Sequence, residues 1–195
     1  MKNAFDRITS AVALAALSPL FGAVAVAIKA DSAGPVFFRQ ERVGQFGKPF
    51  RIHKFRTMVN EKPRVNVSAA GDPRVTRVGK VLRKTKIDEL PQLIDVFVGD
   101  MSIVGPRPEV PEYVDQWPEE LRPLILSVRP GITDPASIKY RNEAEELAQA
   151  DDPERYYVDV LLPRKTQLYA EYVRNRSFTR DLQIILETLI TVIRD

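Results

Sequence analysis

Two adjacent carboxylates, Asp88 and Glu89, are the side chains of this sequence best placed to do chemistry. Basic residues gather just before them in the chain: Arg74, Arg77, Lys80, Arg83, Lys84 and Lys86. Cations beside carboxylates lower the carboxylate pKa values and also attract phosphates. This combination suits an anionic nucleophile that must approach an anionic, metal-bound diphosphate. A plainer interpretation stays open, because an Asp-Glu pair at a helix start is often ordinary capping and a basic stripe is usually a solvated face.

A short amphipathic helix is expected to position these carboxylates. Four apolar residues recur at i, i+3, i+4 and i+7 and so share one face: Leu90, Leu93, Ile94 and Phe97. Pro91 is tolerated in the first turn, where N–H groups have no intrahelical partner. Asp88 is then the predicted N-cap, and Gly99 stands where the helix should end. If residues 75–84 are also helical, positions 74, 77, 80 and 83 or 84 share one basic face.

The composition limits the other kinds of site. The 195 residues suffice for one domain with a core, and the net charge of +3 allows an anionic partner without requiring one. The absence of cysteine excludes disulfides, thiolate metal sites and a cysteine nucleophile. His53 is the only histidine, which excludes a histidine-rich metal site, and a Ser-His-Asp triad would have to use it. A hard cation would therefore bind oxygen ligands, as Mg²⁺ does.

Residues 8–28 form an uncharged apolar run that is long enough to cross a bilayer as a helix. A cleaved signal peptide and a simple spanning helix are two alternatives. The third is a re-entrant hairpin broken at Ser18-Pro19. Pro19 removes a backbone hydrogen bond and kinks a helix, and the Ser18 hydroxyl can bond back to the carbonyl of Leu14. Basic residues flank both ends of the run, so a helix that bends and returns keeps both flanks on the cytoplasmic side.

The remaining elements are expected to be short. Residues 35–40 and 49–58 predict two strands of a hairpin that turns at Gly44 and Gly47. His53 is interpreted as structural or exposed. Residues 61–73 predict a loop, and seven prolines between positions 106 and 135 exclude a long helix there but allow a short one at 119–128. Residues 177–193 predict an amphipathic helix that either closes the core or lies at a membrane interface, with the pattern slightly favouring the core.

Seven strings, in order along nearly the whole chain, resemble the monotopic phosphoglycosyl transferases, the bacterial sugar transferases that begin glycan assembly on a polyprenol carrier. They are FDR (5–7), SP (18–19), GPVFFRQERVG (34–44), KFRTM (54–58), IDELPQL (87–93), GDMSIVGPRP (99–108) and RPGIT (129–133). The resemblance implies an α/β monotopic membrane protein with a re-entrant helix hairpin at 1–30 and a cytoplasmic catalytic domain at 31–195. A small antiparallel β element and several amphipathic or interfacial helices complete the expected fold.

The resemblance also implies an enzyme and its reaction. A UDP-sugar and polyprenol phosphate would give polyprenol-diphosphate-sugar and UMP through a covalent aspartyl-phosphosugar intermediate on Asp88. Glu89 would help to bind metal or to position and deprotonate the acceptor. Asp88 is carried over as a ligand of Mg²⁺. Lys54, Arg83 and Arg107 are carried over as phosphate or nucleotide contacts, with Arg141 a weaker candidate.

Localisation and partners follow from the same resemblance. The protein is expected in the bacterial inner membrane, with membrane lipids as partners, with its catalytic domain on the cytoplasmic face and with no nucleic-acid partner. Because the chain begins directly at the apolar run, it looks like a minimal catalytic form, and its oligomeric state is left open. One departure concerns Asp134 and Pro135, which stand where many members continue with Gly-Trp-Ala-Gln. The alternative from another class is a non-catalytic membrane-surface protein that binds anionic lipids or recruits partner enzymes.

Overall fold

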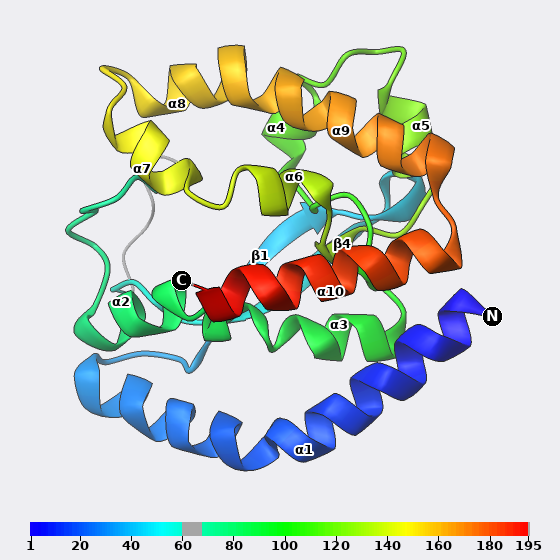
Figure 1. Cartoon of the computed structure of the whole chain (residues 1–195). Coiled ribbons are helices and arrows are strands. Elements are labelled where there is room, and N and C mark those ends of the chain that lie inside the picture. Colours follow the sequence, from blue (N-terminus) through cyan, green and yellow to red (C-terminus); the bar gives the residue numbers. More distant parts are fainter. Residues whose placement is uncertain (60–67, 195) are drawn as a thin grey trace.

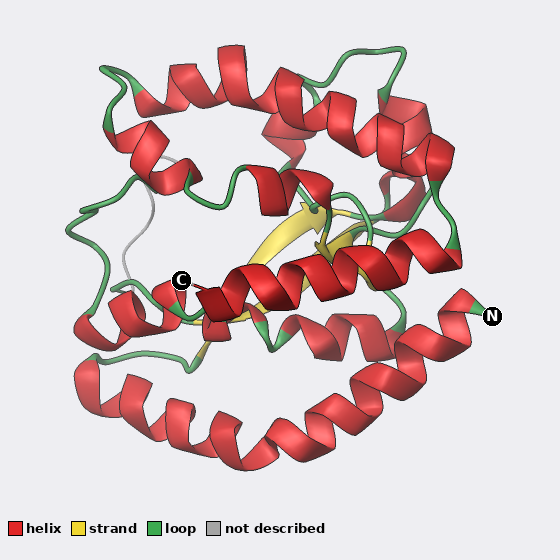
Figure 2. Cartoon of the chain, viewed as in Figure 1, coloured by secondary structure: helices red, strands yellow, loops and turns green. Residues whose placement is uncertain are grey.

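The computed structural model describes residues 1–59 and 68–194. Its described residues combine many helices with two small sheets of two strands each, so the predicted mixed α/β class is confirmed (Figure 2). The elements, in chain order, are α1 (Lys2–Asp31), β1 (Phe37–Val43), η1 (Gln45–Gly47), β2 (Pro49–Phe55), α2 (Arg77–Lys84), η2 (Ile87–Glu89), α3 (Gln92–Val98), β3 (Ser102–Val104), α4 (Pro111–Val114), α5 (Arg122–Leu126), β4 (Gly131–Thr133), α6 (Pro135–Lys139), α7 (Glu143–Ala148), α8 (Pro153–Tyr156), η3 (Tyr157–Leu161), α9 (Leu162–Asn175) and α10 (Phe178–Arg194).

The apolar run lies within α1, one continuous helix that bends near its middle (Figure 1). Pro19 lies inside this helix and has no N–H to donate to the carbonyl of Ala15, four residues earlier. The Ser18 hydroxyl donates to that same carbonyl over 2.8 Å. The expected acceptor, Leu14, was therefore wrong, because the carbonyl that Pro19 leaves without a donor is the better partner. Pro19 thus leaves the Ala15 carbonyl without a backbone donor, and the Ser18 hydroxyl supplies a donor in its place.

The second half of α1 packs against the rest of the protein. Val24 and Ile28 are buried in a cluster with Phe55 of β2 and Leu82 of α2. The apolar middle of the helix is largely exposed, and only 11% of its most apolar window is buried. By length and composition α1 is the one helix of the described residues that could cross a membrane.

The first half of α1 is fixed by a buried carboxylate. Asp6 is fully buried and accepts hydrogen bonds from the Ser102 hydroxyl over 2.8 Å and from Arg129 over 3.0 Å. These contacts join the start of α1 to β3 and to the segment before β4. Both halves of α1 are thus integrated into the fold, which argues against a cleaved signal peptide.

Strands β1 and β2 form the predicted antiparallel hairpin, with Phe37 opposite Phe55 and Val43 opposite Pro49. The turn is η1, which follows Gly44 and ends with Gly47, as expected. Each strand covers seven residues, so the first extends beyond the predicted residue 40 and the second stops before residue 58. Most of the predicted loop at 61–73 lies outside the described residues.

Strands β3 and β4 form a parallel pair that the sequence did not predict. Each has only three residues, too few for a periodic signal. Two glycines allow the strands to approach. A Cβ atom on Gly131 would lie 2.1 Å from the backbone nitrogen of Gly105, closer than any real contact. The pair therefore requires glycine at this position.

The largest core lies between the proline-rich segment and α9. Trp117, Leu121 and Ile125 from that segment are buried together with Tyr169 and Ala170 of α9. The predicted absence of a long helix between 106 and 135 is confirmed, since α4 and α5 have four and five residues. In Figure 1, α9 runs along one edge of the molecule and α1 along the other, with the strands and α10 between them.

Helix α10 confirms the predicted helix at 177–193, but its apolar face does not close the core. Leu186 and Leu189 are 59% and 55% exposed, whereas Asp181 and Ile184 face inward. The inward face is decided by Asp181, which accepts a hydrogen bond from Tyr172 over 2.7 Å and pairs with Lys2 over 2.6 Å. A pattern of apolar residues could not have shown this, because the buried anchor of the helix is polar.

We expect Gly79→Ala to destabilise the fold, because its Cβ atom would lie 2.1 Å from the carbonyl oxygen of Thr57. The helix α2 would have to move away from β2, at a cost of about 1–3 kcal/mol in the free energy of unfolding. Gly22→Ala is the matched control, since nothing lies within 4 Å of its added Cβ and alanine favours helix. Thermal unfolding of the detergent-solubilised protein should show a lower midpoint for Gly79→Ala alone. Equal midpoints would contradict the close packing.

Candidate active site

Four segments bring the predicted site residues together. Strand β2 supplies Lys54, the turn η2 supplies Asp88 and Glu89, and the chain after β3 supplies Arg107 between two prolines. The last turn of α2 supplies Arg83. The chain passes from α2 to η2 through Lys86, which has a left-handed backbone with φ of 57°. This sharp turn aims both carboxylates toward the cationic side chains.

The predicted capping role of Asp88 was wrong. Asp88 and Glu89 lie in the 3-10 turn η2, and α3 begins only after Pro91, without a side-chain cap. Gly99 ends α3 with φ of 102°, as predicted. Because the carboxylates lie one turn before the helix, they are available for contacts other than its N-terminal N–H groups.

The predicted apolar face of α3 is only partly buried. Val96 is fully buried and Phe97 is 49% exposed, so the predicted face is rotated. Gln92 and Asp95 are buried instead, and Asp95 accepts hydrogen bonds from both the backbone N–H and the ring Nδ1 of His53. These polar contacts hold α3 against β2 and decide which face turns inward.

Glu89 is held between two cations. Its Oε1 lies 2.9 Å from Nζ of Lys54 and 2.6 Å from Nη2 of Arg107, and its Oε2 accepts from Nη1 of Arg107 over 3.1 Å. Gln92 adds a weaker contact to Oε2 over 3.3 Å. Burial alone would raise the pKa of Glu89, but Arg107 and Lys54 outweigh it and hold that pKa well below its usual range. Glu89 is therefore expected to be ionised at neutral pH and to be a poor general base.

Asp88 is in the opposite situation. It is only 9% exposed, and it makes no hydrogen bond or ion pair with any residue that the structure describes. Burial and the neighbouring charge of Glu89 raise its pKa to about 6, against the attraction of Lys54, Arg83 and Lys86. The surrounding cations do lower this pKa, as expected, but burial and the charge of Glu89 outweigh them, so the net shift is upward. Asp88 is therefore a buried carboxylate that is more basic than an ordinary aspartate.

Arg83 is the one member of the predicted basic stripe that turns inward to the site. Its Nε donates to the Thr57 hydroxyl over 2.9 Å and its Nη1 to the Ser68 hydroxyl over 2.8 Å. Arg74 lies before α2 rather than on it and pairs with Asp72 over 2.6 Å. The stripe therefore divides into one residue that faces Asp88 and several that lie on the surface.

Two other candidates lie apart from this cluster. Arg141 is exposed in the segment between α6 and α7 and is not among the groups paired with Asp88 or Glu89. His53 is structural, as expected, because Nδ1 pairs with Asp95 over 2.6 Å and Nε2 contacts Arg39. With both ring nitrogens engaged in this way, His53 does not form a Ser-His-Asp triad.

The sequence did not predict the polar side chains that fix Arg83 and Glu89 in the site. Thr57 and Ser68 fix Arg83, and Gln92 supports Glu89. Thr57 and Gln92 belong to the strings KFRTM and IDELPQL, so a signal was present but carried no indication of role. The structure also gives a role to Asp134. Its buried carboxylate caps α6 by accepting hydrogen bonds from the N–H groups of Ala136 and Ser137. At the position where this chain departs from Gly-Trp-Ala-Gln, Asp134 is therefore the N-cap of α6.

The described residues contain no cluster of three or more acidic, histidine or cysteine side chains that could enclose a metal. They do fit a metal that binds mainly through substrate. Asp88 offers one carboxylate without a partner, whereas Glu89 is taken up by Lys54 and Arg107. Mg²⁺ commonly takes one or two carboxylates, with phosphates and waters as its other ligands. A magnesium-diphosphate complex could therefore bind at Asp88.

Comparison with known proteins adds to this geometry. The sequence model of a family described as "Bacterial sugar transferase" matches residues 1–195. A UDP-N-acetylgalactosamine-undecaprenyl-phosphate N-acetylgalactosaminephosphotransferase of Aeromonas hydrophila is 40% identical over 99% of this chain and 44% of its own length. A UDP-glucose:undecaprenyl-phosphate glucose-1-phosphate transferase of Escherichia coli K12 is 38% identical over 97% of this chain and 39% of its own length.

A shorter relative is matched over most of its length. The exopolysaccharide production protein ExoY of Sinorhizobium fredii is 36% identical over 98% of this chain and 84% of its own length. The chain thus spans less than half of the first two relatives and most of the third.

The unusual pKa of Asp88 predicts a pH-dependent stability. The folded-state pKa of about 6 exceeds the ordinary value of 3.8, so the folded state binds the proton more tightly and stability falls as pH rises between these values. Asp88→Asn removes this penalty and should raise the unfolding midpoint at pH 7 in metal-free buffer. The expected gain is on the order of 2–3 kcal/mol, and it should shrink toward pH 4.

Glu89→Gln provides the contrast. It leaves Lys54 and Arg107 without their carboxylate and should lower the unfolding midpoint at pH 7, since breaking a buried pair costs about 3–5 kcal/mol. Thermal unfolding at pH 4 and pH 7 measures both variants. An Asp88→Asn protein that is less stable than wild type at pH 7, or a pH-independent difference, would show that Asp88 is not a destabilised carboxylate.

Proposed function

Because the chain belongs to the bacterial sugar transferase family, we propose that it transfers a sugar 1-phosphate from a UDP-sugar to polyprenol phosphate with release of UMP. The observation that carries this proposal is the contrast in electrostatic environment between Asp88 and Glu89. Glu89 is neutralised by two cations, whereas the adjacent Asp88 is buried, partnerless among the described residues and raised in pKa. A carboxylate in that condition gains from forming a covalent bond to phosphorus.

In the first half-reaction, a carboxylate oxygen of Asp88 attacks the sugar-bearing phosphorus of the donor. The new bond joins that oxygen to phosphorus, and the bridging P–O bond breaks, with its electron pair leaving on UMP. Lys54, Arg83 and Arg107 would offset the charge of the diphosphate and orient it, which is the main contribution a protein makes to phosphoryl transfer. The pKa of about 6 keeps most Asp88 ionised at neutral pH while leaving it more basic than an ordinary aspartate.

In the second half-reaction, an oxygen of polyprenol phosphate attacks the same phosphorus. The bond to Asp88 breaks, the carboxylate returns and polyprenol-diphosphate-sugar is formed. A phosphate monoester has a second pKa near 6, so the acceptor is largely dianionic at neutral pH and needs little general-base help. Glu89 then serves to position Lys54 and Arg107 rather than to accept a proton, which agrees with its low pKa.

Asp88 is the residue that would hold Mg²⁺. When bound, the metal would supply charge neutralisation at the donor diphosphate. The protein itself contributes one ligand and three nearby cations, and the remaining ligands would come from the diphosphate and water.

We further propose that α1 enters the membrane and returns to the same side. Its bend at Pro19, its exposed apolar surface and the basic residues at both flanks favour this arrangement. The exposed apolar face of α10 and the exposed Phe97 and Val98 of α3 are suited to the interface beside it. The site would then lie near the headgroups on the cytoplasmic face, within reach of the acceptor phosphate.

The covalent step has a direct test. Protein incubated with donor and Mg²⁺ but no acceptor should gain the mass of one sugar phosphate at Asp88, measured by intact-protein and peptide mass spectrometry. UDP-glucose and UDP-N-acetylgalactosamine, the donors in the names of the relatives, are the first two of a donor panel. Asp88→Asn should form no adduct and release no UMP, while membrane association stays unchanged.

The two outcomes against this proposal differ in meaning. Turnover without any adduct would remove the aspartyl intermediate. No turnover with any donor, although the protein remains membrane-bound, would favour the non-catalytic membrane-surface alternative.

The topology has a separate test. Pro19→Ala restores the missing helix hydrogen bond and removes the clash of the proline ring, together worth about 3 kcal/mol, and should straighten α1 so that one end crosses the bilayer. Cysteines introduced at the exposed positions of Ala4 and Ala30 report the side of each end, because the native chain has no cysteine. A membrane-impermeant maleimide should reach both from the cytoplasmic side in the native background and from opposite sides in Pro19→Ala. Gly22→Ala is the control, and opposite labelling in the native background would exclude the re-entrant arrangement.

A further inference from the structure

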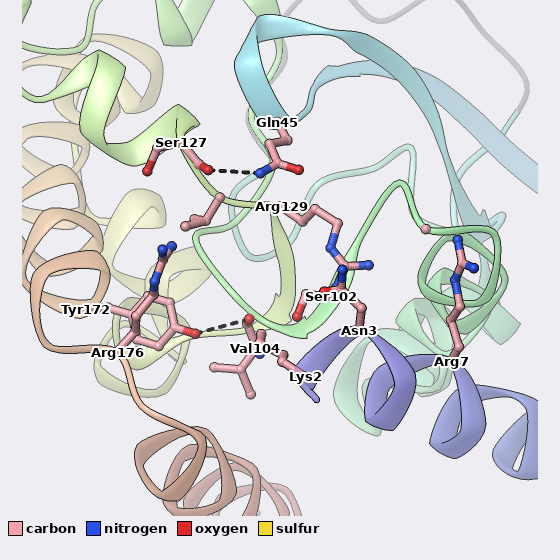
Figure 3. Close-up of a pocket in the computed structure, with 12 residues that line it drawn as sticks. Lys2, Asn3, Arg7, Gln45, Ser102, Val104, Ser127, Arg129, Tyr172 and Arg176 are labelled. Carbon is pink, nitrogen blue, oxygen red and sulfur yellow. Dashed lines mark hydrogen bonds between the residues drawn. The ribbon is translucent and has the colours of Figure 1, made fainter.

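A cavity of about 590 Å³ lies at the end of α3 that is remote from Asp88 and Glu89. Its cationic and amide side chains come from four parts of the chain: Lys2, Asn3 and Arg7 of α1, Gln45 of η1, Arg129 before β4, and Arg176 after α9 (Figure 3). Gly99, which follows the last residue of α3, lines it as well, whereas Asp88 and Glu89 precede the first residue of that helix. None of Lys54, Arg83 and Arg107 contributes to it, so the cavity is separate from the proposed active site.

The cavity is strongly cationic. Among the described residues, four basic side chains and no carboxylate line it. Two of the four are partly neutralised by carboxylates that do not line the cavity, because Lys2 pairs with Asp181 over 2.6 Å and Arg129 with Asp6 over 3.0 Å. The other two, Arg7 and Arg176, have no carboxylate partner in the described part of the chain. Arg7 makes only a long contact of 3.4 Å to a backbone carbonyl.

Uncompensated cations in a concave site attract anions. The walls also carry the Asn3 and Gln45 amides as neutral donors, although one N–H of Gln45 is used by the Ser127 carbonyl over 2.9 Å. Figure 3 shows the side chains of Asn3 and Arg129 close together, with Arg176 on the opposite side beside Tyr172. Arginine guanidinium groups match phosphate oxygens in pairs, and the volume falls in the range of small-molecule sites. The lining therefore favours a phosphate that carries a polar substituent.

The surface beside the cavity is apolar. Phe5 of α1 and Phe178 of α10 meet edge to face, with ring centroids 5.1 Å apart. Ile8 on α1 is 66% exposed, and Phe178 and Leu182 on α10 are also exposed. A ligand that combines a phosphate with hydrocarbon chains would match both surfaces, which a soluble phosphate would not.

We propose that this cavity binds the phosphodiester headgroup of an acidic phospholipid, with the acyl chains lying along the exposed residues of α1 and α10. Phosphate recognition follows from the cavity alone, whereas a lipid source rests on the proposed membrane location. Bound lipid would fix the start of α1 to the start of α10, because Lys2, Arg7 and Arg176 come from either side of the site.

The test is a calorimetric titration of the detergent-solubilised chain with dihexanoylphosphatidylglycerol, kept below its critical micelle concentration. Arg7→Gln and Arg176→Gln should each weaken binding about tenfold, the effect of losing one charge-assisted hydrogen bond. Arg174→Gln is the matched control, since Arg174 is exposed near the end of α9, two positions from Arg176, and does not line the cavity. Three other ligands separate headgroup from chains: dihexanoylphosphatidylcholine, glycerol phosphate and inorganic phosphate.

The acidic lipid should bind most tightly, and the two soluble phosphates should bind more weakly with the same dependence on Arg7 and Arg176. Inorganic phosphate that binds as tightly as the lipid would overturn the lipid assignment. If dihexanoylphosphatidylcholine bound as tightly as the acidic lipid, or if Arg174→Gln weakened binding as much as Arg7→Gln and Arg176→Gln, the cavity would not be the binding site. Asp88→Asn should bind the lipid normally, which keeps this result distinct from the transfer reaction, and displacement of the lipid by UDP-sugar would reassign the cavity to the donor.

Discussion

The pairing of Glu89 with Lys54 and Arg107 is the interaction on which the candidate site depends. It joins three segments that are distant in sequence: a hairpin strand, a 3-10 turn and a proline-bounded stretch after a parallel strand. Burying three charged groups is costly unless they satisfy one another, so this arrangement is stable only as a complete set. Its second effect falls on Asp88. The neighbouring Asp88 makes no ion pair among the described residues, and its burial and the charge of Glu89 raise its pKa despite the attraction of Lys54, Arg83 and Lys86.

The same principle of buried polar contacts fixes the apolar helices. Asp6 holds the start of α1 against Ser102 and Arg129, and Asp181 holds α10 against Tyr172 and Lys2. Each aspartate faces inward on a helix whose apolar residues largely face outward. This inverts the usual pattern of a soluble protein, in which apolar faces are buried and charged faces are solvated. Such an inversion is suited to a protein whose surroundings are partly hydrocarbon.

The local elements could be predicted from sequence because their signals are local. The hairpin with its glycine turn, the end of α3 at Gly99 and the bend at Pro19 each depend on a few adjacent residues. The errors arose where distant partners decide. The inner faces of α3 and α10 are set by the contacts of Asp95 with His53 and of Asp181 with Tyr172. The capping role of Asp88 failed for a local reason instead, because Lys86 adopts a left-handed backbone. The gathering of Lys54, Glu89 and Arg107 was expected only from family resemblance, since no periodicity relates them.

The parallel pairing of β3 with β4 carries a consequence for how the protein is made. It joins Ser102 to Gly131 and Val104 to Thr133, and the chain immediately after β3 carries Arg107. Contacts between segments so far apart in sequence form late, because the intervening loop must close first. During synthesis α1 emerges long before residue 133, so the apolar helix can enter the bilayer while Arg107 still has no fixed position. With α1 in the membrane as proposed, the nascent chain would dock there as an inert polypeptide, and the proposed reactive centre would assemble afterwards.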